Sequence, residues 1–184
     1  MKLSKPPAIS LSSKIAELSK LNILSLVLVA TFLGFYLGSN GEMEYNKLLL
    51  TLLGTALTAA GSGSLNHYLE RDADKKMDRT RNRPLPSGTL TPLFAVLYGM
   101  ALVVVGSVTL AYFINLLTGF LSLLTAFLYI VVYTPLKKIT WLNTSIGSIP
   151  GAIPIIGGWT AASNSISPMA VSYTHLRAHE TPRY

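Results

Sequence analysis

Residues 66–85 read NHYLERDADKKMDRTRNRPL and lie between two long apolar runs. This stretch holds ten charged residues, including half of the eight acidic residues in the chain. Asn66, Glu70 and Asp74 recur at i, i+4 and i+8, so they share one face if the preceding apolar segment continues through them as a helix. The spacing predicts a stripe of oxygen-bearing side chains along that face.

The stretch combines groups that suit a metal ion with groups that suit a phosphate. Mg²⁺ takes carboxylate oxygens together with substrate phosphate oxygens and water. Six basic side chains supply donors for phosphate, and they are Arg71, Lys75, Lys76, Arg79, Arg81 and Arg83. The alternative is a charged helix end that only solvates and orients the segment. The shared face, and its direct continuation from an apolar run, favour a functional site.

The composition is that of a membrane protein. Half of the 184 residues are hydrophobic, 12% are charged and the mean hydropathy is +0.46, whereas soluble domains carry about twice that share of charge. The chain has no cysteine, which excludes disulfides, thiolate metal sites and a cysteine nucleophile. The net charge of +7 is concentrated at the ends of apolar segments. This pattern indicates membrane lipid and a polyanionic small molecule as partners, and no nucleic acid.

The apolar segments predict an all-α fold, a polytopic transmembrane helical bundle. Four of them are close to the roughly 20 residues that span a bilayer, and they are Leu21–Gly38, Leu48–Leu65, Pro92–Ile114 and Leu116–Pro135. A fifth, Ser145–Ala162, contains two prolines and four glycines, which are tolerated in lipid where helices pack closely or line a cavity. Residues 1–20 are polar and are predicted to form a cytoplasmic amino-terminal arm, without a signal-peptide pattern.

Basic residues alternate between the two sides of the predicted bundle. The amino-terminal arm has four, the charged stretch has six, and Lys137 and Lys138 follow the fourth span. On the other side, the first connection has one basic residue, Lys47, and the second connection has none. The positive-inside rule therefore places the amino terminus and the charged stretch in the cytoplasm, where a phosphorylated substrate would be met.

Two further patterns concern packing and a second polar pair. Small residues allow helices to pack closely in lipid, and such packing of the second span would hold the stripe on a rigid element. The small residues of this span are Gly54, Ala56, Ala59, Ala60, Gly61, Ser62, Gly63 and Ser64. Tyr133 and Lys137 lie four apart around Pro135, and alone they are typical of an interfacial tyrosine and a snorkelling lysine. His67 lies off the stripe, and we do not expect it to bind metal or haem.

These motifs resemble those of the UbiA-type intramembrane prenyltransferases. Asn66-xxx-Glu70-xxx-Asp74, followed by RTRNRPL at 79–85, is similar to the first aspartate-rich motif of that family, and Tyr133-xxx-Lys137 is similar to an element after its fourth helix. Within the family, the sequence most resembles the protohaem IX farnesyltransferase (haem O synthase) branch. The residues that carry this resemblance are Met77, Tyr133, Thr134, Lys137, Lys138, Thr140, Asn143, Gly151, Ala152, Pro154, Gly158 and Trp159.

The resemblance implies a reaction and a location. A farnesyl group would pass from farnesyl diphosphate to a vinyl group of haem B, with water supplying a new hydroxyl, to give haem O. The enzyme would be a multi-pass protein of the inner (plasma) membrane with its amino terminus in the cytoplasm. Downstream haem-modifying or terminal-oxidase assembly proteins are the further partners that it implies.

The resemblance also implies roles for the polar residues. The catalytic residues and ligands of the cofactor Mg²⁺ would be Asn66, Glu70 and Asp74, with Asp78 as an outer ligand. The diphosphate-binding residues would be Arg79, Arg83, Lys137 and Tyr133. The hydroxyl of Tyr133 would orient the diphosphate.

Two departures from the family pattern bear on these expectations. Glu70 stands where many relatives carry aspartate, which keeps the charge but lengthens the reach. Members of the family have nine helices, and this sequence provides about five of them. The family's second acidic motif lies after these five. We therefore interpret residues 21–170 as a partial membrane domain and expect no turnover by the chain alone. Residues 171–184 resemble translated adaptor sequence and are predicted to be a non-native tail.

Three alternatives remain at this point. The chain could belong to another UbiA-type prenyltransferase that acts on 4-hydroxybenzoate or another aromatic acceptor. It could be a transporter or channel fragment, which would place charged residues in the middle of spans. It could also be a non-catalytic membrane subunit, which would not need a metal and phosphate site.

Overall fold

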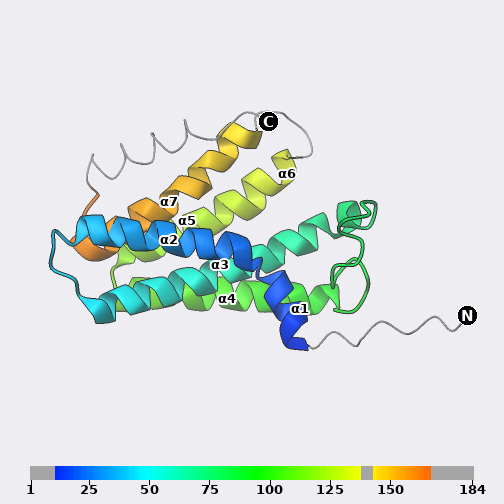
Figure 1. The fold of residues 1–184 in the computed structure, drawn as a ribbon, viewed down its shortest axis with the longest axis horizontal. Helices are drawn as coiled ribbons and strands as arrows, with labels where there is room; N and C mark the ends of the chain where they lie inside the picture. Colours follow the sequence, from blue (N-terminus) through cyan, green and yellow to red (C-terminus); the bar gives the residue numbers. More distant parts are fainter. Residues whose placement is uncertain (1–10, 138–142, 167–184) are drawn as a thin grey trace, which may run out of the picture.

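The computed structural model describes residues 11–137 and 143–166, and within these ranges all the regular structure is helical (Figure 1). The elements are α1 (Leu11–Leu18), α2 (Leu21–Gly38), α3 (Tyr45–Asp74), α4 (Pro92–Phe113), α5 (Leu116–Phe127), the π-helix η1 (Leu128–Tyr133), α6 (Thr134–Leu136) and α7 (Asn143–Ser163). The predicted all-α class is confirmed. The predicted tail at 171–184, Lys138 and Thr140 lie outside the described residues.

Four helical segments are long and apolar enough to cross a membrane. They are Leu21–Gly38, Tyr45–Asp74, Pro92–Phe113 and Leu116–Leu136, which confirms the four predicted spans and a multi-pass membrane protein. The second span is longer than predicted, because α3 continues from the apolar run through the first part of the charged stretch. The fifth predicted span corresponds to α7, which is helical with Pro150 and Pro154 inside it but is not among these four in the described part of the chain.

The helices pack in pairs that depend on small residues. α3 packs against α4 and α2 packs against α7, while α5 contacts both α4 and α7 (Figure 1). A Cβ at Gly61 of α3 would lie 2.5 Å from the carbonyl oxygen of Gly99 in α4. The backbones therefore approach each other where side chains are absent, as the small residues of the second span predicted.

Local capping defines where α4 and α5 begin. The Oγ1 atom of Thr91 accepts a hydrogen bond from the backbone N–H of Phe94 at 3.3 Å, and Pro92 occupies the first turn of α4. The Oδ1 atom of Asn115 accepts from the backbone N–H of Thr118 at 2.7 Å and starts α5. Because only two residues separate α4 from α5, the two helices form a tight hairpin.

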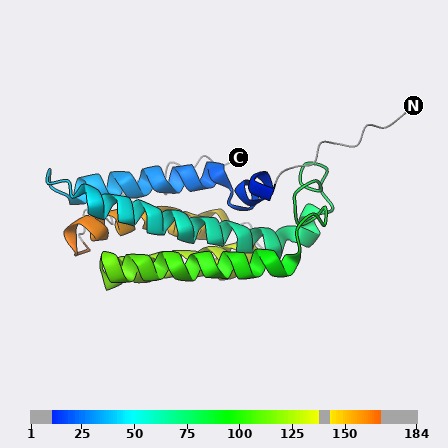
Figure 2. The ribbon, with the colours of Figure 1, turned by 90° about the horizontal axis from the view of Figure 1, so that it is seen from below.

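Part of the predicted amino-terminal arm is the helix α1. Leu18, at its end, is fully buried against Leu85 and Ala95. Figure 2 shows α1 at the end of the bundle where the loop after α3 also lies. This contact fixes the start of α2, where Lys20 has a left-handed backbone with φ 48°.

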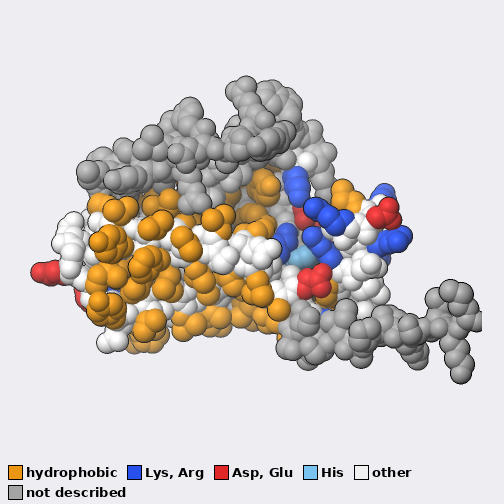
Figure 3. All heavy atoms as spheres, in the orientation of Figure 1, with side chains coloured by type: hydrophobic (Ala, Val, Ile, Leu, Met, Phe, Trp, Pro, Cys, Tyr) orange, Lys and Arg blue, Asp and Glu red, His pale blue; other side chains and the backbone are white. Residues whose placement is uncertain are grey.

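The surface of the bundle is divided between apolar and charged regions (Figure 3). Large apolar side chains such as Leu26, Leu97 and Val104 are exposed along the helices. On this face the lysine and arginine side chains gather at one end with several acidic ones, around the end of α3 and the loop that follows it, and further acidic side chains lie at the opposite end. An apolar belt with charges at its end is the pattern of a bundle that faces lipid.

Candidate functional site

The predicted stripe lies on one face of α3 and is buried. Asn66, Glu70 and Asp74 are 1%, 7% and 5% exposed, respectively. Regular helix from Tyr45 to Asp74 places these residues one turn apart. The register that the sequence predicted is therefore confirmed, and the burial shows that the stripe is more than a solvated helix end.

Two lysines from different elements converge on Glu70. The Nζ atom of Lys137, after α6, lies 3.3 Å from Oε1 of Glu70. The Nζ atom of Lys20, at the start of α2, lies 3.9 Å from Oε2 and also donates a hydrogen bond to Oδ1 of Asn66. Residues that are distant in sequence thus enclose one carboxylate from two sides.

Asp74 is paired with a residue of the loop that follows α3. The Nη1 atom of Arg83 lies 2.9 Å from Oδ2 of Asp74. The loop turns back because the hydroxyl of Thr80 donates to the carbonyl oxygen of Asp74 at 2.9 Å and because Pro84 and Leu85 are buried. Of the six bases in the stretch, Arg83 is the one that the described structure pairs with the stripe.

The π-helix η1 and the short helix α6 bring Thr134 and Lys137 to α3. The Nδ2 atom of Asn66 donates to Oγ1 of Thr134 at 2.9 Å, and that hydroxyl donates to the carbonyl oxygen of Tyr129 at 2.8 Å. The acceptor lies five residues back, as the wider turn of a π-helix allows. Tyr133 stacks on Tyr129 with ring centroids 5.6 Å apart. The backbone remains helical across Pro135, since the N–H of Lys137 donates to the carbonyl oxygen of Tyr133 at 3.0 Å.

Two predicted residues are not brought to the stripe. The side chain of Asp78 is 95% exposed and lies 3.1 Å from Arg81, its partner three residues on. Arg79 is also exposed on the loop. His67 is buried next to Asn66, and its Nε2 has no hydrogen-bond partner among the described residues.

Lys20 is the site residue that the sequence did not predict. It is one of the four bases of the amino-terminal arm, and no spacing in the sequence links it to Asn66 or Glu70. Burial lowers the pKa of its ammonium group, and the nearby Glu70 carboxylate opposes that shift. With Lys137 and Arg83 it makes three cations facing two carboxylates, so the cluster has an excess of positive charge.

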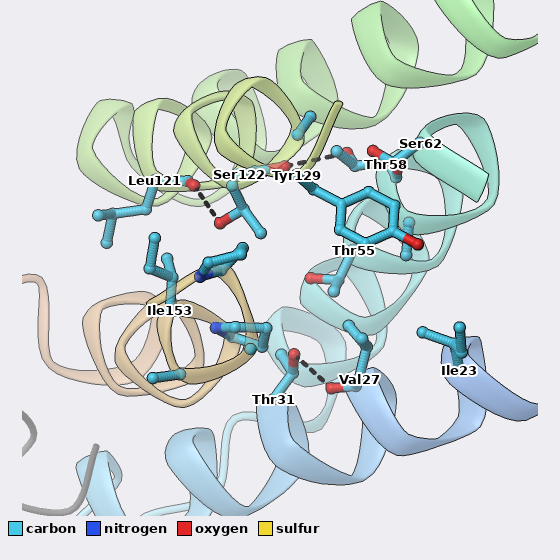
Figure 4. Close-up of a pocket in the computed structure, with 18 of the residues that line it drawn as sticks. Ile23, Val27, Thr31, Thr55, Thr58, Ser62, Leu121, Ser122, Tyr129 and Ile153 are labelled. Atoms are coloured by element: carbon cyan, nitrogen blue, oxygen red, sulfur yellow. Dashed lines mark hydrogen bonds between the residues drawn. The ribbon is translucent and has the colours of Figure 1, made fainter. Parts of the chain in front are cut away.

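A cavity of about 520 Å³ adjoins the cluster. Figure 4 shows it between α2, α3, α5 and α7, with Val27 and Thr31 of α2 on one side and Leu121 and Ser122 of α5 on the opposite side. Its walls are mainly apolar with scattered hydroxyls. Ser62, which lines the cavity, lies one turn before Asn66 on the same face of α3, so this part of the cavity wall is next to the stripe. An apolar cavity with a few charged groups beside it is suited to a long apolar ligand with a charged head.

The chain is similar to proteins of one family. The model of the UbiA prenyltransferase family matches residues 27–176. Protoheme IX farnesyltransferase of Salinibacter ruber is 47% identical over 149 residues, covering 81% of this chain and 53% of that protein. The Aquifex aeolicus protein of the same name is 43% identical over 156 residues, covering 84% and 53%. The human mitochondrial one is 41% identical over 152 residues, covering 83% and 34%. The chain thus spans about half the length of these bacterial relatives.

Solved structures share the fold. A UbiA homologue from Archaeoglobus fulgidus bound to GPP and Mg²⁺ has a TM-score of 0.77 and 20% identity, covering 90% of this chain and 60% of that one. A structure concerning digeranylgeranylglyceryl phosphate synthase in membranes has a TM-score of 0.78 and 20% identity, covering 91% and 58%. At this level of identity the likeness concerns the arrangement of the helices.

Proposed function

Because the chain belongs to the UbiA prenyltransferase family, we propose that it forms the diphosphate-binding part of an enzyme that transfers farnesyl from farnesyl diphosphate to a vinyl group of protohaem IX, giving haem O. The main observation in support of the proposal is that the stripe of Asn66, Glu70 and Asp74 is buried, is paired with cations and lies next to an apolar cavity. The names of the relatives support haem B as the acceptor.

The donor set fits Mg²⁺. No group of three or more acidic or histidine side chains forms a metal site in the described ranges. The stripe instead offers two carboxylates and an amide oxygen, and Mg²⁺ commonly completes such a set with substrate phosphate oxygens and water. Asn66, Glu70 and Asp74 would hold the metal, which supplies positive charge to the leaving diphosphate.

The cations would stabilise the diphosphate as it leaves. The bond from C1 of the farnesyl chain to the diphosphate oxygen breaks, and both electrons leave with the oxygen. Arg83 and Lys137, already beside the stripe, would move their hydrogen bonds from Asp74 and Glu70 to the diphosphate, where charge increases in the transition state. Tyr133, at the cavity wall, would orient the leaving group.

The cavity would control the fate of the allylic cation. Its mainly apolar wall would hold the farnesyl chain and keep bulk water from C1. The vinyl electrons of haem B then form the new carbon–carbon bond to C1. The resulting cation beside the porphyrin takes up one water and releases a proton, so that haem B, farnesyl diphosphate and water give haem O and diphosphate.

An acceptor assay tests this function. A version of the chain extended with the remaining helices of a relative, supplied with Mg²⁺ and farnesyl diphosphate, is expected to convert haem B into haem O, detected by chromatography and mass. 4-Hydroxybenzoate in the same assay is expected to remain unprenylated. Prenylation of the aromatic acid in place of haem B would assign the chain to another branch of the family.

The alternation of basic connections gives a topology that can be measured. The chain has no cysteine, so single cysteines at Lys75 and Glu44 report one position each. We expect a membrane-impermeant maleimide to label Glu44→Cys in intact cells and Lys75→Cys only after the cells are opened, because the positive-inside rule places the loop after α3 in the cytoplasm. Labelling of Lys75→Cys in intact cells would place the diphosphate site on the outer side.

A transporter remains the rival from another class. In the described helices the charged side chains lie at or near the ends of the spans, and the cavity wall lacks charged residues. An ion or polar solute path requires charged or paired polar groups in the middle of the membrane. The arrangement therefore favours a prenyltransferase.

A further inference from the structure

Lys20 makes contacts that a surface lysine does not. Its ammonium donates to Oδ1 of Asn66 and lies 3.9 Å from Oε2 of Glu70, and its side chain is only 19% exposed. It is held there by its neighbours. Leu18, two residues earlier, is fully buried against Leu85 and Ala95. Lys20 is therefore built into the site by the packing of α1.

The oxygens that Lys20 binds are two of those proposed to bind Mg²⁺. One ammonium group and one metal ion cannot both occupy the space between Asn66 and Glu70. While Lys20 stays there, it satisfies an amide oxygen and a carboxylate that are buried and would be unfavourable if left unpaired. For the metal to enter, the ammonium must move to another anion, and the incoming diphosphate supplies one.

We propose that Lys20 blocks the Asn66 and Glu70 oxygens when no substrate is bound and becomes a diphosphate-binding residue when Mg²⁺ and the prenyl diphosphate enter together. This inference rests on the proposed function. Lys137 has a different role, because among the described residues its ammonium pairs with Oε1 of Glu70 and not with Asn66, and its side chain is 50% exposed. The exchange makes divalent-metal binding weak in the absence of diphosphate.

Metal and diphosphate binding to Lys20→Met should change in opposite directions. The variant removes the ammonium but keeps an unbranched stem. In the purified 184-residue chain in lipid nanodiscs, we expect Mn²⁺ alone, followed by its electron paramagnetic resonance signal, to bind severalfold more tightly than to the unmutated chain. We expect a non-hydrolysable thio analogue of farnesyl diphosphate, with Mg²⁺ present, to bind at least about tenfold more weakly, because a charge-assisted hydrogen bond is lost. Lys14→Met, on α1, is the matched control and should change neither affinity.

Chemical rescue separates the role of the charge from effects on folding. Since the chain has no cysteine, Lys20→Cys can be modified at one position in an already folded sample. Aminoethylation of the thiol, which rebuilds a lysine-like ammonium, should restore diphosphate affinity and weaken Mn²⁺ binding. Methylthiolation, which adds no charge, should do neither.

The outcomes distinguish the two proposals. If the unmutated chain, both as the 184 residues and in the extended version, shows no Mg²⁺-dependent binding of the analogue, the proposed function and this inference both fail. If it binds the analogue but removal of the Lys20 ammonium lowers both affinities or neither, only the inference fails. Equal effects of aminoethylation and methylthiolation on Lys20→Cys would likewise show that Lys20 acts through packing alone.

Discussion

Replacing Asp74 with asparagine in the extended version of the chain is expected to lower kcat/KM for farnesyl transfer by about 10²- to 10³-fold, the effect of losing one electrostatic contact to a transition state. Asp74 is buried and paired with Arg83 at 2.9 Å. Asparagine keeps the size of the side chain but removes the charge that would hold the metal and orient Arg83. Steady-state kinetics with haem B and farnesyl diphosphate measures the change.

The neighbouring Asp72 provides the control for that experiment. Its side chain is 73% exposed, and its carboxylate lies 3.6 Å from Arg71 on the outside of the helix. Asp72→Asn removes the same charge two residues away and should leave kcat/KM within about twofold, since exposed pairs contribute little. Similar small losses in both variants would mean that the stripe on α3 does not take part in catalysis.

Gly61→Ala is expected to lower the free energy of unfolding by about 1–3 kcal/mol, the usual effect of inserting a methyl group into a closely packed interface. The new Cβ would lie 2.5 Å from the carbonyl oxygen of Gly99 and 2.9 Å from the backbone nitrogen of Val103. α3 and α4 would have to move apart, which would also displace the part of α3 next to the stripe. Thermal unfolding of the chain in detergent measures the effect.

Gly151→Ala makes the same chemical change at a position with room for it. Apart from its chain neighbours and the nearby backbone of α7 itself, no described atom lies within 4 Å of a Cβ built at Gly151. Alanine is favoured over glycine inside a helix by about 1 kcal/mol, so this variant should be at least as stable as the unmutated chain. If both variants unfold at the same temperature, contact between the backbones of α3 and α4 does not limit stability.

The spans and the stripe could be predicted because each depends on local sequence alone. Lipid requires every backbone polar group to be bonded within its own segment, so apolar length was sufficient to predict four spanning helices. Spacing of four residues was sufficient to place Asn66, Glu70 and Asp74 on one face. The roles of these residues in metal binding stay a prediction that the Asp74 experiment addresses.

The partners of the stripe could not be predicted because they depend on tertiary packing. Spacing alone does not distinguish the six bases of residues 66–85 from one another. The burial of Leu85, together with the Thr80 hydrogen bond, brings Arg83 to Asp74, while Arg79 stays exposed. Lys20 reaches Glu70 only because α1 is anchored by Leu18. Neither arrangement has a signature in spacing or hydropathy.

The π-helix at Leu128–Tyr133 has a consequence for aligning this chain with distant relatives. A π-helical hydrogen bond encloses one residue more than an α-helical one, and in a regular α-helix one residue corresponds to a rotation of about 100°. Thr134 and Lys137, which contact Asn66 and Glu70 of α3, therefore reach that helix only with the additional residue in place. An alignment without gaps to a relative whose corresponding helix is regular would match Thr134 and Lys137 to residues that point about 100° away from α3. Correct matching requires a gap of one position within 128–133.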